Sequence, residues 1–416
     1  MSVKSSLPTL SAGLLVAATG VGAGDLVISA LAGARFGYTL LWAIAVGAVL
    51  KFVLNEGLAR WELATGTTLL EGWVERLPRY IVLYFGVYLC FWACLVAGTL
   101  ISYTGLVANT VFPLPLSEAG GTAVWGALQS VIALLLVRFG GFRGVEVAMK
   151  VVIAVMFLVV IGCAVALLPP AGEVLRGMLL PTLPADRQSV VFTLALIGGV
   201  GGTLTIMCYA YWLREKRTIG EVSLRAVRLD LGVAYVLTAL FGVAVTVIAA
   251  QVRPEDVGGF RMVIGLAEQL ATVLGQPGYW IFLLGFWAAV FTSMVGVWSG
   301  VPYLFADLWQ RYRRRYATGP EPTIKLRDTA AYRYFLLYLA LPPILLTMYQ
   351  RPAWIGIAYA VSGAAFMPFL ALTLLYLNNR RAWVEPLQNG WLTNAVLGAS
   401  LLLFLLLLAS ELEILG

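Results

Sequence analysis

The sequence predicts an all-α integral membrane protein, with eleven transmembrane helices in a single membrane domain over residues 1–416. Hydrophobic residues make up 61% of the chain and charged residues only 12%, a balance that one soluble core cannot hide. Several apolar stretches reach the ~20 residues that a helix needs to cross a bilayer, whereas barrel strands would be short and alternating. Two of these stretches are broken by glycine clusters.

Each predicted span is an apolar run between polar breaks. The first follows a single lysine, Lys4, and has no small-residue cleavage site ahead of a mature domain, so we expect it to be retained. The eleven spans are predicted at residues 8–34, 39–62, 80–111, 122–139, 145–168, 190–212, 229–251, 278–307, 331–349, 354–377 and 391–411.

Basic residues predict the orientation of these spans in a cell membrane. They concentrate in alternate loops, on the same side as Lys4: Arg76/Arg79, Arg138/Arg143, Arg214/Lys216/Arg217/Arg225/Arg228, Arg311 to Arg333 and Arg380/Arg381. The N-terminus is therefore expected to be cytoplasmic and the C-terminus external. The run of arginines from Arg311 to Arg315 fits anionic lipid and orientation better than nucleic acid, so the bilayer is the expected partner.

The composition argues against enzymatic chemistry. The chain has no histidine, the commonest zinc ligand and general base. Its four cysteines (Cys90, Cys94, Cys163, Cys208) all fall in apolar stretches, where cysteine is usually a small buried hydrophobe. We find no set of nucleophile, base and orienting group and no cofactor motif, so we expect neither an enzyme nor a bound cofactor.

The two glycine clusters lie at Thr19 to Asp25 in the first span and at Gly198 to Gly202 in the sixth. An offset of five spans reverses the second block in the membrane. This predicts an inverted 5+5 repeat, with blocks at 1–168 and 189–377 and an additional helix at 391–411. Broken helices in matching positions are typical of a transport site near the midplane, although glycines also allow close helix packing.

Asp25 is the strongest candidate site residue, because a carboxylate inside a span is costly unless water, a cation or a partner compensates it. Freed carbonyls beside it suit a hard cation. The alternative is that Asp25 caps the half-helix that follows Gly24. Glu56 is spaced i, i+4 with Arg60, which favours a structural ion pair near the cytoplasmic end, with Lys51 paired elsewhere in the bundle.

Residues 11–25, followed by Ala32-Gly33-Ala34-Arg35-Phe36-Gly37-Tyr38 and Leu40-Leu41-Trp42, resemble the first helix of the Nramp divalent-metal transporters. Further resemblances are Ala64-Thr65-Gly66, Phe142 to Glu146, Ala288 to Gly300 and Met367-Pro368-Phe369. The resemblance covers nearly the whole chain at a low level. It implies a LeuT-like fold with helices 1 and 6 broken, and metal transport.

The departures from the family fall on the chemistry. Where the family has Asp-Pro-Gly-Asn this chain has Gly22-Ala23-Gly24-Asp25, and where it has Met-Pro-His-Asn this chain has Leu204-Thr205-Ile206-Met207. The later family histidine aligns with Tyr211, and a glutamine of the tenth helix with Phe366. The third span contains none of the acids that conduct protons in the family. A soft ligand and the proton relay are therefore missing, which makes proton coupling doubtful.

Three functions remain open. The first is a secondary transporter, functional as a monomer, for a harder cation such as Mn²⁺ or Mg²⁺. Its metal ligands would be Asp25 and carbonyls at Gly22 and Gly201, and its other predicted contacts are Ala23, Thr203, Leu204, Thr205 and Phe366. The second is a transporter of a small organic solute such as an amino acid, whose carboxylate would meet a half-helix N-terminus. The third is a non-transporting relative that kept the fold.

Overall fold

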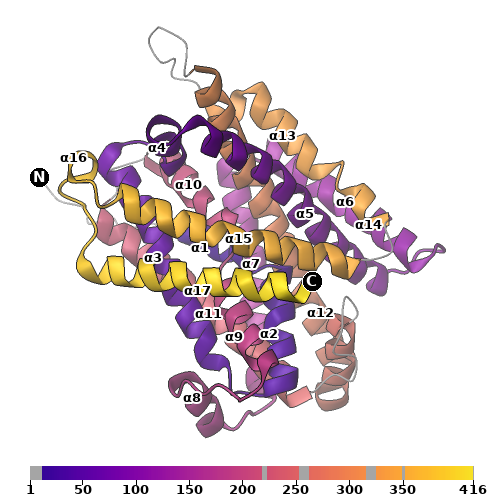
Figure 1. The fold of residues 1–416 in the computed structure, drawn as a ribbon. Helices are drawn as coiled ribbons and strands as arrows, with labels where there is room; N and C mark the ends of the chain where they lie inside the picture. The colour runs from indigo at the N-terminus through magenta and orange to yellow at the C-terminus, as the bar shows by residue number, and fades with distance from the viewer. Residues whose placement is uncertain (1–11, 218–222, 253–261, 315–324, 349–351, 416) are drawn as a thin grey trace, which may run out of the picture.

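The computed structural model describes residues 12–217, 223–252, 262–314, 325–348 and 352–415 (Figure 1). Helices account for nearly all of these residues, and none of the described segments forms a β-strand. The all-α prediction is therefore confirmed. Asp25 lies within a described helix, but its side chain and that of Ala23 lie outside what the structure describes.

All eleven predicted spans coincide with helices. The first and sixth are each interrupted, as predicted. In chain order the spans are α1 (Ala12–Gly20) with α2 (Ala23–Phe36), α3 (Leu41–Thr65), α5 (Arg79–Val111), α6 (Glu118–Phe139), α7 (Gly141–Ala166), α9 (Arg187–Gly199) with η1 (Leu204–Met207) and α10 (Cys208–Arg217), α11 (Leu224–Val252), α12 (Met262–Arg314), α13 (Ala330–Ala340) with α14 (Ile344–Met348), α15 (Pro352–Leu377) and α17 (Trp391–Leu415).

Length and composition agree with a membrane location. Among the described residues, eight helical segments are long and apolar enough to cross a bilayer, and three shorter apolar helices accompany them. Large apolar side chains also face outward, as on α7, where Val151 is 61% exposed and Leu158 is 76% exposed. Such side chains are stable on an outer surface when that surface meets lipid.

The structure adds short helices that periodicity did not predict. These are α4 (Leu69–Arg76), α8 (Ala171–Leu179), α16 (Arg381–Val384), and the segment of α12 that precedes a kink at Gly275. The ninth span is also divided between α13 and α14, at Pro342 and Pro343, which cannot donate helical hydrogen bonds. Segments this short are set by capping and by neighbours. Thr68 and Glu71, for example, form a reciprocal capping box that starts α4.

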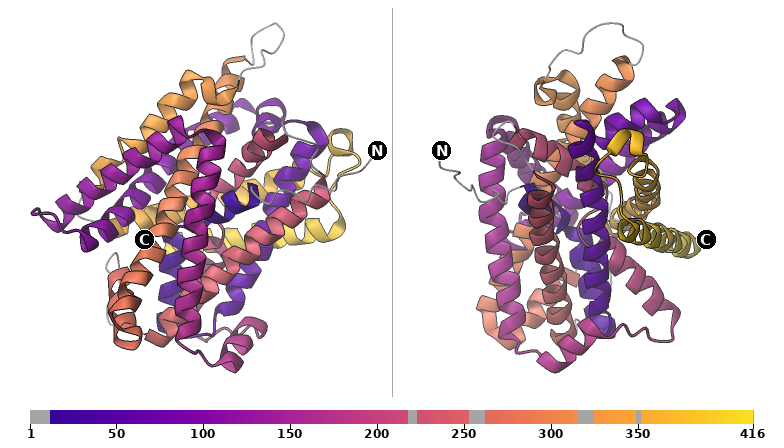
Figure 2. Two further views of the ribbon diagram at one scale, coloured as in Figure 1. Left: turned by 180° about the vertical axis from the view of Figure 1, so that it is seen from behind. Right: turned by 90° about the vertical axis from the view of Figure 1, so that its left-hand side faces the viewer.

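Spans five apart in the sequence pack against each other. The second contacts the seventh (α3 with α11), and the third contacts the eighth (α5 with α12). The eleventh, α17, runs beside α15 along one flank of the bundle (Figures 1 and 2). The helices α4 and α8 lie at opposite ends of the molecule (Figure 1). This arrangement places the two broken spans inside the bundle.

Candidate functional site

The first break separates α1 from α2 at Val21 and Gly22. The helical bonding of α1 ends where Val21 N donates to Ala17 O at 2.9 Å, and that of α2 begins where Leu26 N donates to Gly22 O at 3.2 Å. The hydroxyl of Ser293, on α12, donates to the carbonyl of Thr19 at 2.7 Å. A side chain of α12 therefore binds the last turn of α1, just ahead of the break.

The second break runs from Val200 to Thr203, between α9 and η1. Gly201 and Gly202 have φ values of +79° and +80°, a region that side chains strain to enter. A Cβ on Gly201 would lie 2.6 Å from Cε1 of Tyr235, and one on Gly202 would lie 2.5 Å from Oγ1 of Thr205. Both glycines are thus required by conformation and by space.

The two breaks touch. A Cβ on Gly20 would lie 2.7 Å from the carbonyl carbon of Gly201, and one on Gly202 would lie 3.3 Å from the Cα of Gly20. The half-helices beside them pair crosswise, because α1 contacts α10 while α2 contacts α9. The two broken spans therefore run antiparallel and meet at their non-helical backbone.

The predicted residues of the first break lie at the start of α2. That helix begins at Ala23 with Gly22, which has no side chain, at its N-cap. The alternative that Asp25 caps a half-helix beginning after Gly24 is therefore wrong, since Asp25 is three residues inside α2. An acidic residue in the first turn still favours the helix dipole. The carbonyl of Gly22 accepts the first hydrogen bond of α2.

The predicted residues of the second break are all buried: Leu204 is fully enclosed, and Thr203 and Thr205 are 9% and 5% exposed. In the described structure the hydroxyl of Thr203 has no hydrogen-bond partner. It faces α15, where a Cβ on Gly363 would lie 3.0 Å from it. A buried hydroxyl without a protein partner is available to a ligand.

Phe366 belongs to an aromatic cluster. Its ring centroid is 5.9 Å from that of Tyr88, 6.0 Å from Phe85 and 6.5 Å from Trp73. The cluster joins α15 to α4 and α5, and it lies one helical turn beyond Gly363 in the sequence. The assignment of Phe366 as a lining residue of the site stays a prediction.

Buried ionic groups also lie inside the bundle. The Lys51 ammonium, on α3, donates to the carbonyl of Gly202. Asp230, on α11, accepts from the backbone N–H of Gly13 at 2.7 Å and from the Tyr209 hydroxyl at 3.3 Å. Sequence reasoning did not single out Asp230, although an acid inside the seventh span was a visible signal. The predicted pair of Glu56 with Arg60 is confirmed at 2.6 Å.

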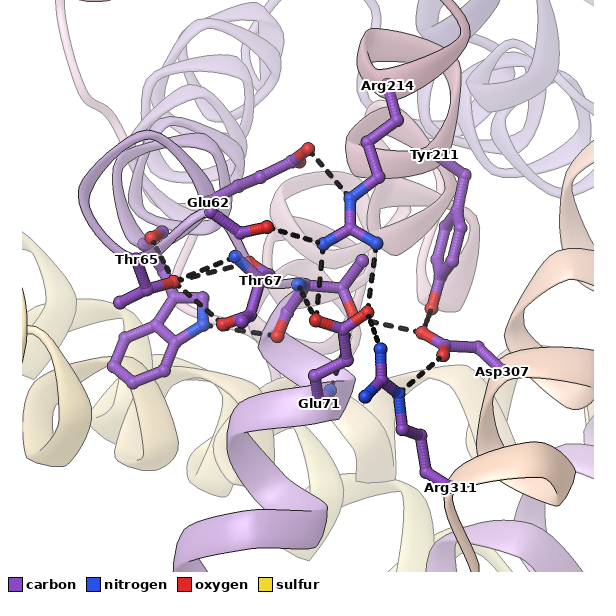
Figure 3. Close-up of polar contacts among 11 residues, drawn as sticks. Glu62, Thr65, Thr67, Glu71, Tyr211, Arg214, Asp307 and Arg311 are labelled. Atoms are coloured by element: carbon purple, nitrogen blue, oxygen red, sulfur yellow. Dashed lines mark hydrogen bonds and ion pairs between the residues drawn. The ribbon is translucent and has the colours of Figure 1, made fainter. Parts of the chain in front are cut away.

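An ionic network joins α10 to neighbouring helices (Figure 3). Its centre is Glu71, on α4, whose Oε1 is 2.9 Å from Nη1 of Arg214 and 2.8 Å from Nη2 of Arg311. Arg214 also contacts Glu62 of α3 at 3.1 Å. The carboxylates are buried while the guanidinium groups are partly exposed.

A second acid continues the network. Asp307, on α12, accepts from Tyr211 at 2.7 Å and from Thr68 at 3.0 Å. Arg311 reaches it from one helical turn away, at 3.5 Å. The network therefore ties the half-helix α10 to α3, α4 and α12, all through side chains on the side that the arginine pattern predicts to be cytoplasmic (Figure 3).

Nearly the whole chain matches one family model. The model for natural resistance-associated macrophage protein-like proteins, Nramp, matches residues 13–412. The chain belongs to the Nramp family. This confirms the resemblance drawn from the first helix and from residues 32–42.

Curated Nramp relatives share a modest identity with this chain. The divalent metal cation transporter MntH of Bacillus subtilis is 22% identical over 407 residues, which are 93% of this chain and 88% of that protein. The MntH of Chromohalobacter salexigens is 29% identical over 244 residues. That match covers 56% of this chain and spans only about half of the relative, 52% of its length.

Solved structures of low identity show the fold. A manganese transporter of Eremococcus coleocola, in complex with an aromatic bis-isothiourea substituted compound, superposes with a TM-score of 0.74 at 17% identity. The match covers 97% of this chain and 87% of that one. MhsT in complex with L-phenylalanine matches with a TM-score of 0.66 at 16% identity, over 96% of this chain and 98% of that one. The LeuT-like fold is thereby confirmed.

The side-chain donors of this Nramp protein are few. Within the described part of the chain, no three His, Cys, Asp or Glu side chains gather closely enough to hold a metal ion. The oxygen atoms that the structure describes at the breaks are those of the backbone carbonyls and of the Thr203 and Thr205 hydroxyls. Such a set is hard in character and suits Mg²⁺ or Mn²⁺ rather than a soft metal.

Proposed function

We propose that this chain is a secondary transporter that moves a divalent metal cation, such as Mn²⁺ or Mg²⁺, across the membrane by alternating access. The observation that carries the proposal is the contact between the two helix breaks at Gly20 and Gly201. Unwound backbone of two antiparallel half-helix pairs offers carbonyl oxygens and helix ends at one point inside the bundle. The curated relatives are divalent metal cation transporters, which supports the same substrate class.

The proposed ligands are the carboxylate of Asp25, carbonyls of Gly22 and Gly201, and hydroxyls of Thr203 and Thr205. Ala23 and Leu204 would contact the ion's shell through their backbone. The unpartnered hydroxyl of Thr203 supports a ligand at the second break. One carboxylate balances only half of a divalent charge, so we expect retained waters in the shell, as is usual for Mg²⁺.

Alternating access requires the half-helices to move against a scaffold. We propose that α10 opens when the network around Glu71 and Asp307 separates, and that blocks 1–168 and 189–377 are the two inverted repeats. The crosswise pairing of the half-helices supports this division. The N-terminus would be cytoplasmic, the C-terminus external and the working unit a monomer. Enzymatic activity forms no part of the proposal.

We infer that transport does not use an acid relay in the third span. Residues 79–111, which form α5, contain no Asp, Glu or His. A proton path along that helix would lack groups that exchange protons near neutral pH. Uptake driven by the ion gradient alone is the expectation, and it should depend weakly on the pH difference across the membrane.

The test is uptake by the purified protein in sealed liposomes, with Mn²⁺, Mg²⁺ and Ca²⁺ presented separately. Saturable flux that is lost in Asp25→Ala would support the proposal and rank the ions. The isosteric Asp25→Asn reports on charge without a change of volume. Absence of flux with any divalent ion, in protein shown to be folded, would overturn the proposal.

A small organic solute is the second candidate. The observation that favours it is the sparse set of acidic side chains in the described structure, together with the buried rings of Trp212 on α10 and Trp298 on α12. Half-helix N-termini bind carboxylates through free amides. Amino acids in the same liposome assay, at a fixed metal concentration, separate the two candidates.

A further inference from the structure

Lys51 carries a positive charge into the centre of the second break. Its side chain is fully enclosed in the protein, halfway along α3. The ammonium donates to the carbonyl of Gly202, 151 positions away in the sequence. It also lies 5.6 Å from the centroid of the Phe404 ring, on α17. Three spans, the second, sixth and eleventh, therefore meet at this one charge.

The location of Lys51 follows from what a buried ammonium requires. A charged group withdrawn from water is stable only where oxygen acceptors, counter-charges or π-faces replace its hydration. The break supplies an acceptor of this kind, because the carbonyl of Gly202 lies in non-helical backbone between α9 and η1. A carbonyl oxygen is equally the ligand that a hard metal cation takes.

The acceptor is fixed in direction by its surroundings. Gly202 adopts a φ of +80° and packs against Oγ1 of Thr205 and the Cα of Gly20, so its peptide plane has little freedom. One helical turn beyond Lys51, Asn55 donates to the Tyr235 hydroxyl at 3.2 Å, and the Tyr235 ring packs on Gly201. The face of α3 therefore supports both glycines of the break.

We propose that Lys51 is an internal cation that competes with the transported divalent ion at the second break, where its ammonium holds the carbonyl of Gly202 next to the proposed ligand Gly201. This inference rests on the proposed function. When no ion is bound, the ammonium neutralises the oxygen-lined break. An ion that binds at this break must push the ammonium aside, because the two positive charges repel each other at short range in a medium of low dielectric.

Two consequences distinguish this role from a merely structural one. If Lys51 competes with the metal ion, removal of its charge should raise the affinity for the ion. If Lys51 only supports the break, its loss should lower that affinity or leave it unchanged. Lys51 would also set the selectivity, since a divalent ion gains more from the oxygens than a monovalent ion when both must displace one ammonium. The position of Lys51 thus acts on affinity and not only on folding.

The experiment is Mn²⁺ binding to the purified full-length protein, measured by calorimetry, in wild type, Lys51→Met and Lys51→Gln. Methionine keeps about the length of the lysine side chain but removes its charge and its N–H donors. Glutamine removes the charge but retains an N–H donor for the Gly202 carbonyl, so it preserves the break if methionine does not fold. Lys150→Met is the matched control, because Lys150 is a half-exposed lysine that pairs with Glu146 on the surface of α7.

We expect both Lys51 variants to bind Mn²⁺ at least tenfold more tightly than wild type, and Lys150→Met to bind within about twofold of it. Detectable binding only in the Lys51 variants would support the inference equally. If folded Lys51→Gln binds Mn²⁺ with the same affinity as wild type, or more weakly, the inference is overturned and the proposed function stays intact. Failure of every variant to bind Mn²⁺, Mg²⁺ or Ca²⁺ would overturn the proposed function, and this inference with it.

Discussion

The hydroxyl of Tyr211 donates a 2.7 Å hydrogen bond to Oδ2 of Asp307, and both residues are almost completely buried. Tyr211 lies on the mobile half-helix of the proposed mechanism, α10, whereas Asp307 lies on α12. A bond between two buried polar groups is expensive to break without replacement. In the proposed mechanism, this contact and the ion pairs of Arg214 hold α10 against its neighbouring helices in the state described here. We call this network, drawn in Figure 3, the latch.

The first prediction concerns this latch. Arg214→Gln removes the charge that pairs with Glu62 and Glu71, and we expect it to raise the rate at which Cys208 reacts with a maleimide several-fold. Cys208 is a fitting reporter because it is fully buried on α10, behind the network. The other three cysteines (Cys90, Cys94, Cys163) are replaced by serine so that only one thiol reacts.

The control for the latch is Arg225→Gln. Arg225 is an exposed arginine of α11, and the structure gives it no ion pair within the described residues. Its variant should leave the reaction rate of Cys208 at the wild-type value. Equal rates in Arg214→Gln and wild type would show that α10 is held closed by packing alone.

The second prediction concerns the break glycines. Gly201→Ala places a methyl group 2.6 Å from the Tyr235 ring at a φ of +79°, so we expect a loss of about 1–3 kcal/mol of stability and a loss of uptake. Thermal unfolding in detergent measures the first effect. Gly232→Ala, in the interior of α11 with no heavy atom within 4 Å of the added group, is the matched control.

The two alanine substitutions should change the stability of the protein in opposite directions. Alanine in a helix interior is favoured over glycine by about 0.5–1 kcal/mol, so Gly232→Ala should be slightly more stable than wild type. A Gly201→Ala protein with wild-type stability and uptake would mean that the positive φ is not needed for function.

The third prediction concerns Glu56, whose buried carboxylate contacts Arg60 at 2.6 Å and Arg228 at 2.9 Å. Glu56→Gln leaves the Arg60 guanidinium, itself 6% exposed, without its counter-charge. We expect a destabilisation of about 3 kcal/mol from the uncompensated charge. Glu146→Gln, which breaks the surface pair with Lys150, should cost about 0–1 kcal/mol. Similar thermal shifts for the two variants would contradict the assignment of Glu56 as a buried structural group.

The fourth prediction concerns topology. Single cysteines at Gly172, on α8, and Gly390, ahead of α17, occupy positions with open space around them. The arginine pattern places the first outside and the second in the cytoplasm. A membrane-impermeant maleimide added to intact cells should label Gly172→Cys and not Gly390→Cys. Labelling of both from outside would show that the assumed number of spans between them is wrong.

The sequence alone located every transmembrane helix to within a few residues at most boundaries. Apolar length decides whether a segment can satisfy its backbone inside a bilayer, and this property is local. The glycine clusters likewise revealed both breaks, because glycine weakens a helix locally, and at the second break Gly201 and Gly202 also adopt positive φ values. Short helices such as α4 escaped prediction, since they depend on capping and neighbouring helices more than on periodicity.

The same reasoning could not bring side chains together across the bundle. Gly20 and Gly201, or Lys51 and Gly202, are separated by 181 and 151 positions, and no local pattern encodes which of them touch. Asp230 was likewise visible in the sequence as an acid inside a span, but the sequence did not reveal that it binds Gly13 and Tyr209. Sequence by itself thus determined the membrane class, the spans, the broken helices and the family. Only the tertiary structure decided that the breaks meet and that a lysine occupies the second, because contacts between distant segments arise from packing of the whole bundle.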